Sequence, residues 1–363
     1  IDGAARPGCN DGVIPANGLI YLGPWACDCN LSLIGNVARC SAGSFDFSVK
    51  PKENPDRLEK GSDIPAESAF EITDADWPTY RGGIDRSSST PVAAKPGRRV
   101  LWQFEANPGF VPSDSVSAGG LVFLGGEDGK IRALDSETGV LRWSFQTGGP
   151  VKYPPTLDGT RAYAGSADGF AYCLDAASGK MIWRFRAAPS ARRIMVYESL
   201  SSTWPVNTGV LVHDGVACFG AGIIDHDGTH LYALDAESGD VIWENHSSGH
   251  LNPELRKGVS VQGNLTLLGD SLVMAGGNVI SPARFDWKTG RCLESARDQG
   301  QPQANGGKFL GNFQGNQLVA GGRILYSSPK NVSTKGSFAV WSADRQSMTL
   351  SQGGIPPAWN DST

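Results

Sequence analysis

An internal repeat with a period near 40 residues constrains the fold of this chain more than any other feature of its sequence. Each copy reads Ala-Leu-Asp or Cys-Leu-Asp, then a Thr-Gly or Ser-Gly pair, and ends on tryptophan. The copies cover residues 133–143, 173–183 and 233–243, and insertions displace the third. Trp102 precedes the first of these tryptophans by 41 residues and closes an earlier unit. A period of this length, with about four short strands per unit, predicts the blades of a β-propeller.

The alternation within each copy agrees with short strands joined by tight turns. Apolar residues alternate with small or polar ones, which is the two-residue period of a strand, and the 363 residues include 47 glycines and 22 prolines. A single blade cannot cover both faces of its sheet, so neighbouring blades must do so, and the recurring tryptophan is a large apolar side chain suited to that contact. The residues predicted to serve this structural repeat are Asp135, Asp175, Asp235, Trp102, Trp143, Trp183 and Trp243.

The repeat pattern Ala-Leu-Asp-x-x-(Thr/Ser)-Gly-x-x-x-Trp resembles the tryptophan-docking repeat of pyrroloquinoline-quinone (PQQ)-dependent dehydrogenases and their cofactor-free relatives. Within that superfamily the chain is similar to PQQ-binding-like repeat proteins of bacteria. Further matching segments are residues 6–9, 15–18, 27–29, 77–83 and 202–206. The resemblance implies an all-β, eight-bladed propeller of four-stranded blades, related to the outer-membrane assembly lipoprotein.

The repeat predicts one propeller domain over residues 1–363, with about six blades in this chain and the others outside it, so that the chain is a fragment. Residues 16–23 match 118–125, so the cysteine-rich region is interpreted as a modified blade in which a loop replaces the third strand. The predicted boundaries are 1–50 for the modified blade, 51–98 for a linker or insertion, and 99–363 for regular repeats.

Charge and hydropathy exclude two classes of partner. The formal net charge is −5 and no run of lysine or arginine stands out, whereas a nucleic-acid partner requires clustered basic residues. No stretch approaches about 18 consecutive apolar residues, so no transmembrane segment is predicted.

Four cysteines near the start of the chain indicate its compartment. Cys9, Cys27, Cys29 and Cys40 lie within 32 residues and allow two disulfides in any of three pairings. Disulfides favour a periplasmic or extracellular location in the bacterial envelope. The alternative is a zinc site with four cysteine ligands, which the Cys-x-Cys spacing fits less well than Cys-x-x-Cys would.

The resemblance also raises the question of a quinone cofactor. Enzymes of this kind typically hold PQQ with a disulfide between adjacent cysteines, a stacking tryptophan and a calcium site of Glu, Asn and Asp, beside an Asp base. This sequence has no adjacent cysteines, and no motif transfers the calcium ligands or the base to particular positions. PQQ and calcium therefore remain an alternative, and no catalytic residue is assigned.

Two insertions are candidate binding sites. The loop with Asp225 and Asp227 has carboxylates and imidazoles suited to a cation, although Asp-Gly is also an ordinary turn. The second insertion contains Arg192, Arg193, Tyr197, Glu198 and Trp204. It joins two blades, so we expect it at one face of the propeller, where it contacts a protein partner or a small ligand. The alternative is a plain surface ion pair between Arg192 and Glu198.

These observations favour a non-catalytic, extracytoplasmic propeller that acts as a binding or scaffold module. The first alternative is a PQQ-dependent dehydrogenase that oxidises alcohols or sugars. The second is an accessory propeller of a larger multidomain enzyme. A propeller fold alone decides among none of these functions.

Overall fold

The computed structural model describes residues 13–22, 37–40, 56–62, 70–93, 100–104, 110–196, 199–223, 225–252, 258–261, 263–276, 280 and 282–294, together with four strands between 318 and 352. Within these residues the chain contains β-strands and two short 3-10 helices, and no α-helix. None of the described helices is long and apolar enough to span a membrane. The prediction of an all-β protein is confirmed.

Every named sheet is antiparallel, and its strands follow one another along the chain except at one edge. The first sheet contains β1 (Val13–Ala16), β2 (Leu19–Leu22) and β3 (Val37–Cys40). The second contains β5 (Pro112–Ala118), β6 (Leu121–Gly126), β7 (Lys130–Asp135) and β8 (Leu141–Gln146). The third contains β9 (Thr156–Asp158), β10 (Arg161–Gly165), β11 (Phe170–Asp175) and β12 (Met181–Arg186), with β4 (Leu58–Lys60) added beside β12.

The remaining strands continue this pattern toward the C-terminus. A hairpin of β13 (Arg193–Val196) and β14 (Ser199–Ser202) precedes the sheet of β15 (Leu211–His213), β16 (Val216–Ala221), β17 (His230–Asp235) and β18 (Val241–Asn245). Next come β19 (Thr266–Leu268), β20 (Ser271–Met274) and β21 (Ala283–Asp286), then β22 (Leu318–Gly321), β23 (Ile324–Ser327), β24 (Ser337–Ser342) and β25 (Met348–Gln352). The two 3-10 helices are η1 (Asp225–Asp227) and η2 (Ser248–His250).

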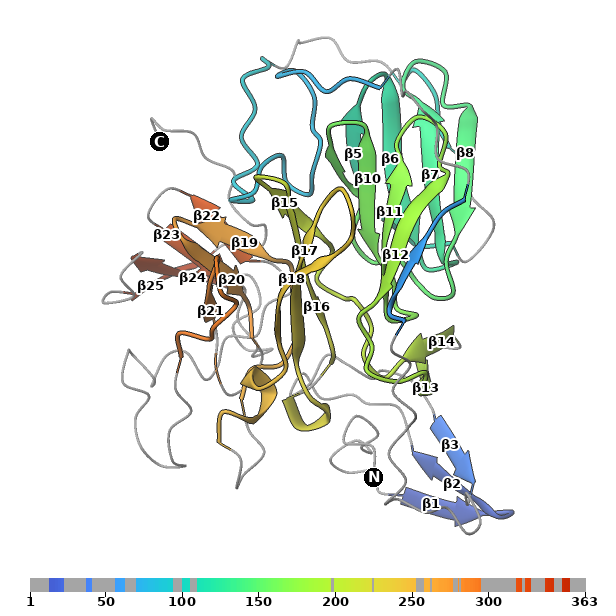
Figure 1. The fold of residues 1–363 in the computed structure, drawn as a ribbon, viewed down its shortest axis with the longest axis vertical. Helices are drawn as coiled ribbons and strands as arrows, with labels where there is room; N and C mark the ends of the chain where they lie inside the picture. Colours follow the sequence, from blue (N-terminus) through green and yellow to red (C-terminus); the bar gives the residue numbers. More distant parts are fainter. Residues whose placement is uncertain are drawn as a thin grey trace.

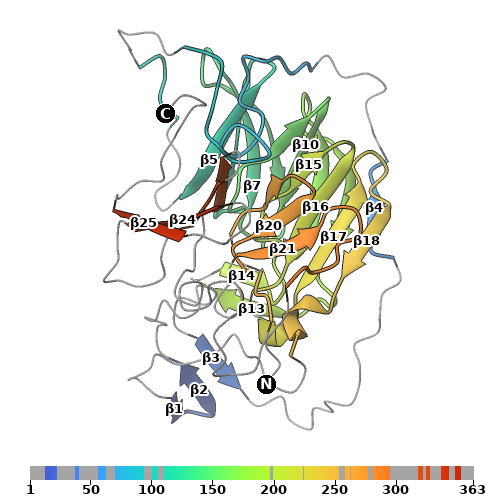
Figure 2. The same cartoon turned by 90° about the vertical axis from the view of Figure 1, so that its left-hand side faces the viewer.

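The sheets β5–β8, β9–β12, β15–β18 and β19–β21 stack against each other as the blades of a propeller do (Figure 1). Three clusters of buried apolar side chains form the core, and each joins two neighbouring sheets: β5–β8 with β9–β12, β9–β12 with β15–β18, and β15–β18 with β19–β21. Figure 2 shows β10, β16, β17 and β20 of these sheets side by side. The number of blades in the complete ring remains a prediction.

The repeat tryptophans lie at the junctions between neighbouring sheets. Each indole N–H donates to a main-chain carbonyl of the following sheet or of the turn within it, at 2.9 to 3.2 Å; the pairs are Trp102 with Ser136, Trp143 with Ala176, Trp183 with Ala236 and Trp243 with Trp287. The same indoles lie over Gly139, Gly179, Gly239 and Gly290, all at positive φ. A Cβ on Gly179, for example, would lie 2.5 Å from Cε3 of Trp143. The Thr/Ser-Gly step therefore both reverses the chain and leaves room for the neighbouring indole.

The repeat aspartates stabilise the turn that precedes the last strand of each copy. Oδ1 of Asp135 accepts hydrogen bonds from the hydroxyl and the backbone N–H of Thr138, and these bonds lower the pKa of this carboxyl. Oδ1 of Asp175 is bonded to Ser178 in the same way. Asp235 accepts the backbone N–H of Ser238, which lowers the pKa of Asp235. This local bonding is typical of Asp at the first position of a turn.

The structure corrects one detail of the cysteine-rich region. The sequence predicted that a loop replaces its third strand, but Val37–Cys40 forms β3 and pairs with β2 from Leu19↔Cys40 to Leu22↔Val37. Four residues are enough to form such a strand. The insertion between β2 and β3 interrupts the repeat pattern, so the strand was not recognised in the sequence. This sheet lies at the lower end of the molecule in Figure 1.

The region predicted as a linker contains segments that contact three sheets. Trp77 pairs with Ser117 of β5 through two backbone hydrogen bonds, Leu157 of β9 donates its N–H to Pro78 O, and Leu267 of β19 donates to Ile84 O. These partners lie on the first strands of three different sheets. The segment therefore runs across those three strands.

Buried hydrogen bonds of Arg86 hold this segment in place. It is 2% exposed, and its guanidinium donates to Leu265 O, Thr79 Oγ1 and Tyr80 O at 2.6 to 3.0 Å. Burial lowers its pKa to about 10.

Candidate functional site

The predicted insertion around Arg192 forms the centre of a polar site at one end of the sheets. The Arg192 Nε–H donates to Thr203 Oγ1 at 3.1 Å, and its guanidinium carbon lies 4.8 Å from the centroid of the Trp204 ring. The Trp204 indole N–H in turn donates to Asp227 O at 2.7 Å, and Arg192 Nη2 lies 3.9 Å from Asp227 Oδ1. The structure thus brings together residues of both insertions that the sequence analysis had treated as separate sites.

The other predicted members of these insertions are placed as follows. Arg193 begins β13, is exposed, and makes no ion pair with any described residue. Tyr197 and Glu198 lie outside the described residues. Asp225 is 3% exposed, and its Oδ2 accepts the N–H of Gly258 at 3.0 Å. That hydrogen bond gives Asp225 a structural role in holding its loop.

A cavity of about 260 Å³ opens beside this cluster. Three arginines supply its positive charge, and they come from β12, the following loop and β13: Arg186, Arg192 and Arg193. Its carboxylates are Asp56, Glu59 and Asp168. A cavity with this lining suits a ligand that carries a charged, hydrogen-bonding group.

Two of these carboxylates are already engaged by the protein. Asp168 is 7% exposed and accepts hydrogen bonds from the Gly148 N–H, the Phe170 N–H and the Tyr172 hydroxyl at 2.6 to 2.9 Å. Both Nε and Nη2 of Arg184 donate to Glu59 Oε2, at 2.9 and 2.6 Å. These bonds satisfy Asp168 and pair Glu59 with Arg184, so the cationic hydrogen-bond donors of the lining are its three arginines.

Arg57, which the sequence analysis did not identify, links this cavity to a neighbouring row of polar residues. Its guanidinium donates to Arg186 O and Ala187 O at 3.1 Å and to the Tyr232 hydroxyl at 2.5 Å. Its Nη1 lies 3.5 Å from Glu244 Oε2. These partners are 129 to 187 residues away in the sequence, so no local pattern could have revealed the contact.

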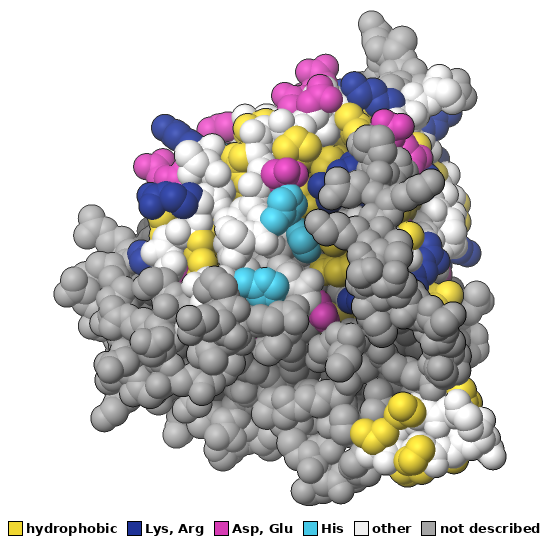
Figure 3. Space-filling model, turned by 60° about the horizontal axis from the view of Figure 1, so that its bottom comes forward, with side chains coloured by type: hydrophobic (Ala, Val, Ile, Leu, Met, Phe, Trp, Pro, Cys, Tyr) yellow, Lys and Arg dark blue, Asp and Glu magenta, His cyan; other side chains and the backbone are white. Residues whose placement is uncertain are grey.

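Two histidines complete the row. Oε2 of Glu244 lies 3.1 Å from His246 Nε2, and His246 Nδ1 lies 2.9 Å from His230 Nδ1. The Trp204 ring packs edge-on against His230, with centroids 6.2 Å apart. Figure 3 shows histidine side chains gathered on this face of the molecule with arginine or lysine side chains near them. Arg192, Trp204 and the histidines thus form one continuous polar surface.

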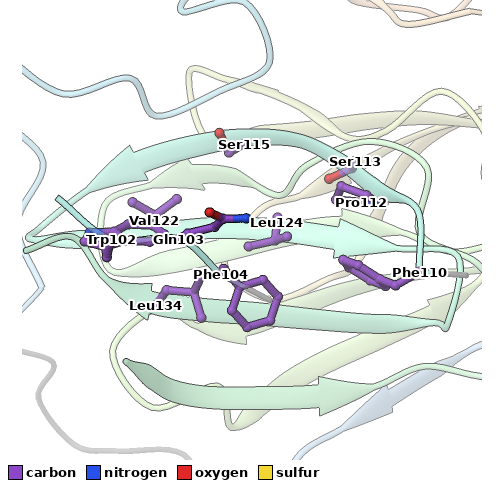
Figure 4. Close-up of a pocket in the computed structure, with 10 residues that line it drawn as sticks. All are labelled: Trp102, Gln103, Phe104, Phe110, Pro112, Ser113, Ser115, Val122, Leu124 and Leu134. Carbon is purple, nitrogen blue, oxygen red and sulfur yellow. The ribbon is translucent and has the colours of Figure 1, made fainter. Parts of the chain in front are cut away.

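A second cavity, of about 680 Å³, lies on the outer face of the β5–β8 sheet and is mainly apolar (Figure 4). Phe123 of β6 packs toward β9–β12, so Val122 and Leu124 point to the opposite face because side chains alternate along a strand. The residues that line the cavity are Trp102, Gln103, Phe104, Phe110, Pro112, Ser113, Ser115, Val122, Leu124 and Leu134. No ionisable side chain is among them, so this cavity offers no group for acid–base or ionic chemistry.

The cysteines divide between the described and undescribed parts of the chain. Cys9, Cys27 and Cys29 lie outside the described residues, and Cys40 ends β3. Cys173 and Cys218 are fully buried, and burial raises the pKa of the Cys173 thiol to about 12. These two thiols are therefore core residues and not nucleophiles.

One feature of the quinone centre that the resemblance implies is missing from the sequence. The seven cysteines include no adjacent pair. Among the described side chains, no group of three or more His, Cys, Asp and Glu residues is close enough to hold a metal ion.

A family model described as outer membrane protein assembly factor BamB matches residues 91–349. None of the curated proteins compared with the chain matches it in sequence.

Among solved structures, the chain is similar to a quinohemoprotein alcohol dehydrogenase from Comamonas testosteroni, with a TM-score of 0.54 and 18% identity over 79% of this chain and 50% of that chain. It is also similar to a europium-containing methanol dehydrogenase (0.53, 10% identity, 77% of this chain and 58% of that chain). A third similar structure is a quinohemoprotein alcohol dehydrogenase from Pseudomonas putida HK5 (0.52, 14% identity, 79% and 49%). The chain thus spans about half the length of these enzymes, and the similarity shows the propeller fold alone.

Proposed function

Because this chain belongs to the propeller family of the outer membrane protein assembly factor BamB, we propose that it is a non-catalytic binding or scaffold module. We propose that it functions outside the cytoplasm, in the periplasm or another part of the bacterial envelope. The module binds a carboxylate-bearing group of a protein or small ligand at the cavity beside Arg192 and Arg193.

The observation that carries this proposal is the arrangement of charge in that cavity. Arg186, Arg192 and Arg193 line it, while Asp168 and Glu59 are engaged by other groups of the protein. A guanidinium matches a carboxylate with two parallel hydrogen bonds, which gives both affinity and orientation. The stacking of Arg192 on Trp204 restricts the arginine side chain, which lowers the entropy that binding must remove.

Site-specific photo-crosslinking in the native cell envelope tests the binding surface. A photoreactive residue is placed at Ser190, which lines the cavity without contributing charge. We expect a discrete crosslinked product that is strongly reduced when Arg192→Ala and Arg193→Ala are added. The matched control places the same photoreactive residue at Glu237, whose side chain is 86% exposed. Glu237 follows the C-terminal end of β17, whereas His230, on the polar surface, begins that strand. Equal products at both positions would contradict a partner at this cavity.

A reconstitution experiment separates this proposal from the enzymatic alternative. The purified chain is mixed with PQQ and calcium, and the quinone absorbance and the dye-linked oxidation of alcohols and sugars are measured. The proposal predicts neither stoichiometric uptake nor turnover. Saturable quinone binding with turnover would identify a dehydrogenase instead.

The intact mass of the natural protein tests the remaining alternative, an accessory propeller of a larger enzyme.

A further inference from the structure

Two histidine side chains face each other across neighbouring strands of the β15–β18 sheet. His230 begins β17 and His246 follows the last residue of β18, and the register Leu231↔Asn245 places them opposite each other. Their Nδ1 atoms are 2.9 Å apart and their ring centroids 5.0 Å apart. No function derived above uses this pair.

The separation of the two nitrogens fits two neighbouring ligands of one metal ion. With metal–nitrogen bonds of about 2.0–2.1 Å, nitrogens 2.9 Å apart subtend an angle of about 90° at the metal, whereas a tetrahedral ion would separate them by about 3.3 Å. An angle near 90° is that of a square-planar or tetragonal ion, the geometry of Cu²⁺ and Ni²⁺ with nitrogen and oxygen ligands. We infer that His230 and His246 form a binding site for such a divalent transition-metal ion, with water completing its coordination.

A carboxylate stands beside one of the two rings. Glu244 Oε2 lies 3.1 Å from His246 Nε2, at ion-pair distance. A carboxylate beside a metal-binding histidine increases the basicity of the ligand. The Tyr232 ring, 5.5 Å from the His246 ring, restricts the imidazole.

The same two nitrogens can share a proton or a metal ion. Without metal, one Nδ1–H can bridge the two histidines. In the metal complex both Nδ1 atoms are ligands, so His230 carries its proton on Nε2 instead.

Copper is the most informative probe because affinity for nitrogen ligands rises to a maximum at Cu²⁺ in the divalent series. The full chain is titrated with Cu²⁺ while electron paramagnetic resonance records the nitrogen hyperfine pattern. We expect one tetragonal Cu²⁺ with two imidazole nitrogens, and we expect that signal to disappear in both His230→Gln and His246→Gln. Glu244→Gln should keep the signal but weaken binding by about 10- to 100-fold, as other losses of such supporting carboxylates do.

Two controls make the outcome decisive. His213 lies at the end of β15, next to Asp214 and Trp287, and His213→Gln should bind Cu²⁺ as the parent chain does. Circular dichroism of each variant shows whether it remains folded. A copper signal that survives both His230→Gln and His246→Gln in folded protein would overturn the inference. So would the absence of a two-imidazole signal in the parent chain, since the pair would then be a simple hydrogen bond.

Discussion

At the scale of single residues, the glycine of each Thr/Ser-Gly step has two separate constraints. It adopts positive φ, and in each copy the indole of the neighbouring sheet lies over it. Gly179 shows both constraints, because φ is +72° and a Cβ would lie 2.5 Å from Trp143. Gly159 shows only the first, since φ is +53° and nothing lies within 4 Å of an added Cβ.

This difference predicts the outcome of a matched pair of substitutions. Gly159→Ala should destabilise the fold by about 1–2 kcal/mol, the cost of left-handed backbone for a residue with a Cβ. Gly179→Ala should add about 1–3 kcal/mol from the collision with Trp143. Urea unfolding followed by circular dichroism measures both. Equal losses would show that the indole does not constrain this glycine.

His230 provides a pH-dependent test at the same scale. Its folded-state pKa of about 3 lies below its ordinary value of 6.5, so below pH 6.5 the unfolded chain binds a proton that the folded chain does not. Folding stability should therefore fall as the pH decreases from 6.5 toward 3, by less than about 1.4 kcal/mol per pH unit because the site is partly solvated.

The comparison with His230→Gln isolates this contribution. The urea midpoint of the parent chain should fall more between pH 7.5 and pH 5 than that of the variant, in which this group cannot titrate. Parallel curves would assign the titration to other groups.

The two histidines are 16 residues apart in the sequence, and only the register of β17 and β18 brings their Nδ1 atoms together. For that reason the sequence analysis considered the imidazoles of the Asp225 loop without pairing any of them with His246.

At the scale of elements, the alternation of apolar residues and the turn dipeptides predicted the regular strands correctly. Asp214-Gly215 illustrates why: both residues adopt positive φ, at 48° and 73°, in the two-residue turn between β15 and β16. Such local chemistry is readable from the sequence. Strand β4 was not readable, because it has three residues and pairs with β12 more than 120 residues later.

The side chain of Leu58 should account for most of the contribution of β4. It packs into the core cluster between β9–β12 and β15–β18, near Gly239 and Trp183. Leu58→Ala should destabilise the protein by about 2 kcal/mol and accelerate hydrogen–deuterium exchange in β12. Glu59→Ala should cost at most about 1 kcal/mol, because its ion pair with Arg184 is solvent-exposed. A larger effect at Glu59 than at Leu58 would mean that charge, not packing, holds β4 in place.

At the scale of the whole molecule, the two ends of the stacked sheets differ in their side chains. The segment with Trp77 and Arg86 runs across the first strands of three sheets and is held by buried hydrogen bonds. Arg192 and the paired histidines lie on the polar surface defined above. The sequence predicted the stack itself from the repeat period. It did not predict this polar surface in full, because Arg57 lies in the predicted linker, far from Glu244 and His246 at the end of β18, and these residues share no motif.

The three core clusters share sheets, which couples the stack from β5 to β21 into one unit. Trp183 is 1% exposed, belongs to the middle cluster and contacts Ala236 of the next sheet. Because each sheet is stabilised mainly by its neighbours, loss of this contact should separate the stack at its centre.

We therefore expect Trp183→Ala to lower stability by about 3–5 kcal/mol and to split a single urea transition into two. Trp102→Ala serves as the control, since Trp102 lies at the edge of the stack and is only partly buried. It should shift the transition without splitting it. Far-ultraviolet and near-ultraviolet circular dichroism, recorded on the same samples, detect the separation. If Trp183→Ala kept one coincident transition, coupling through the backbone and the remaining core would have to be stronger than coupling through this indole.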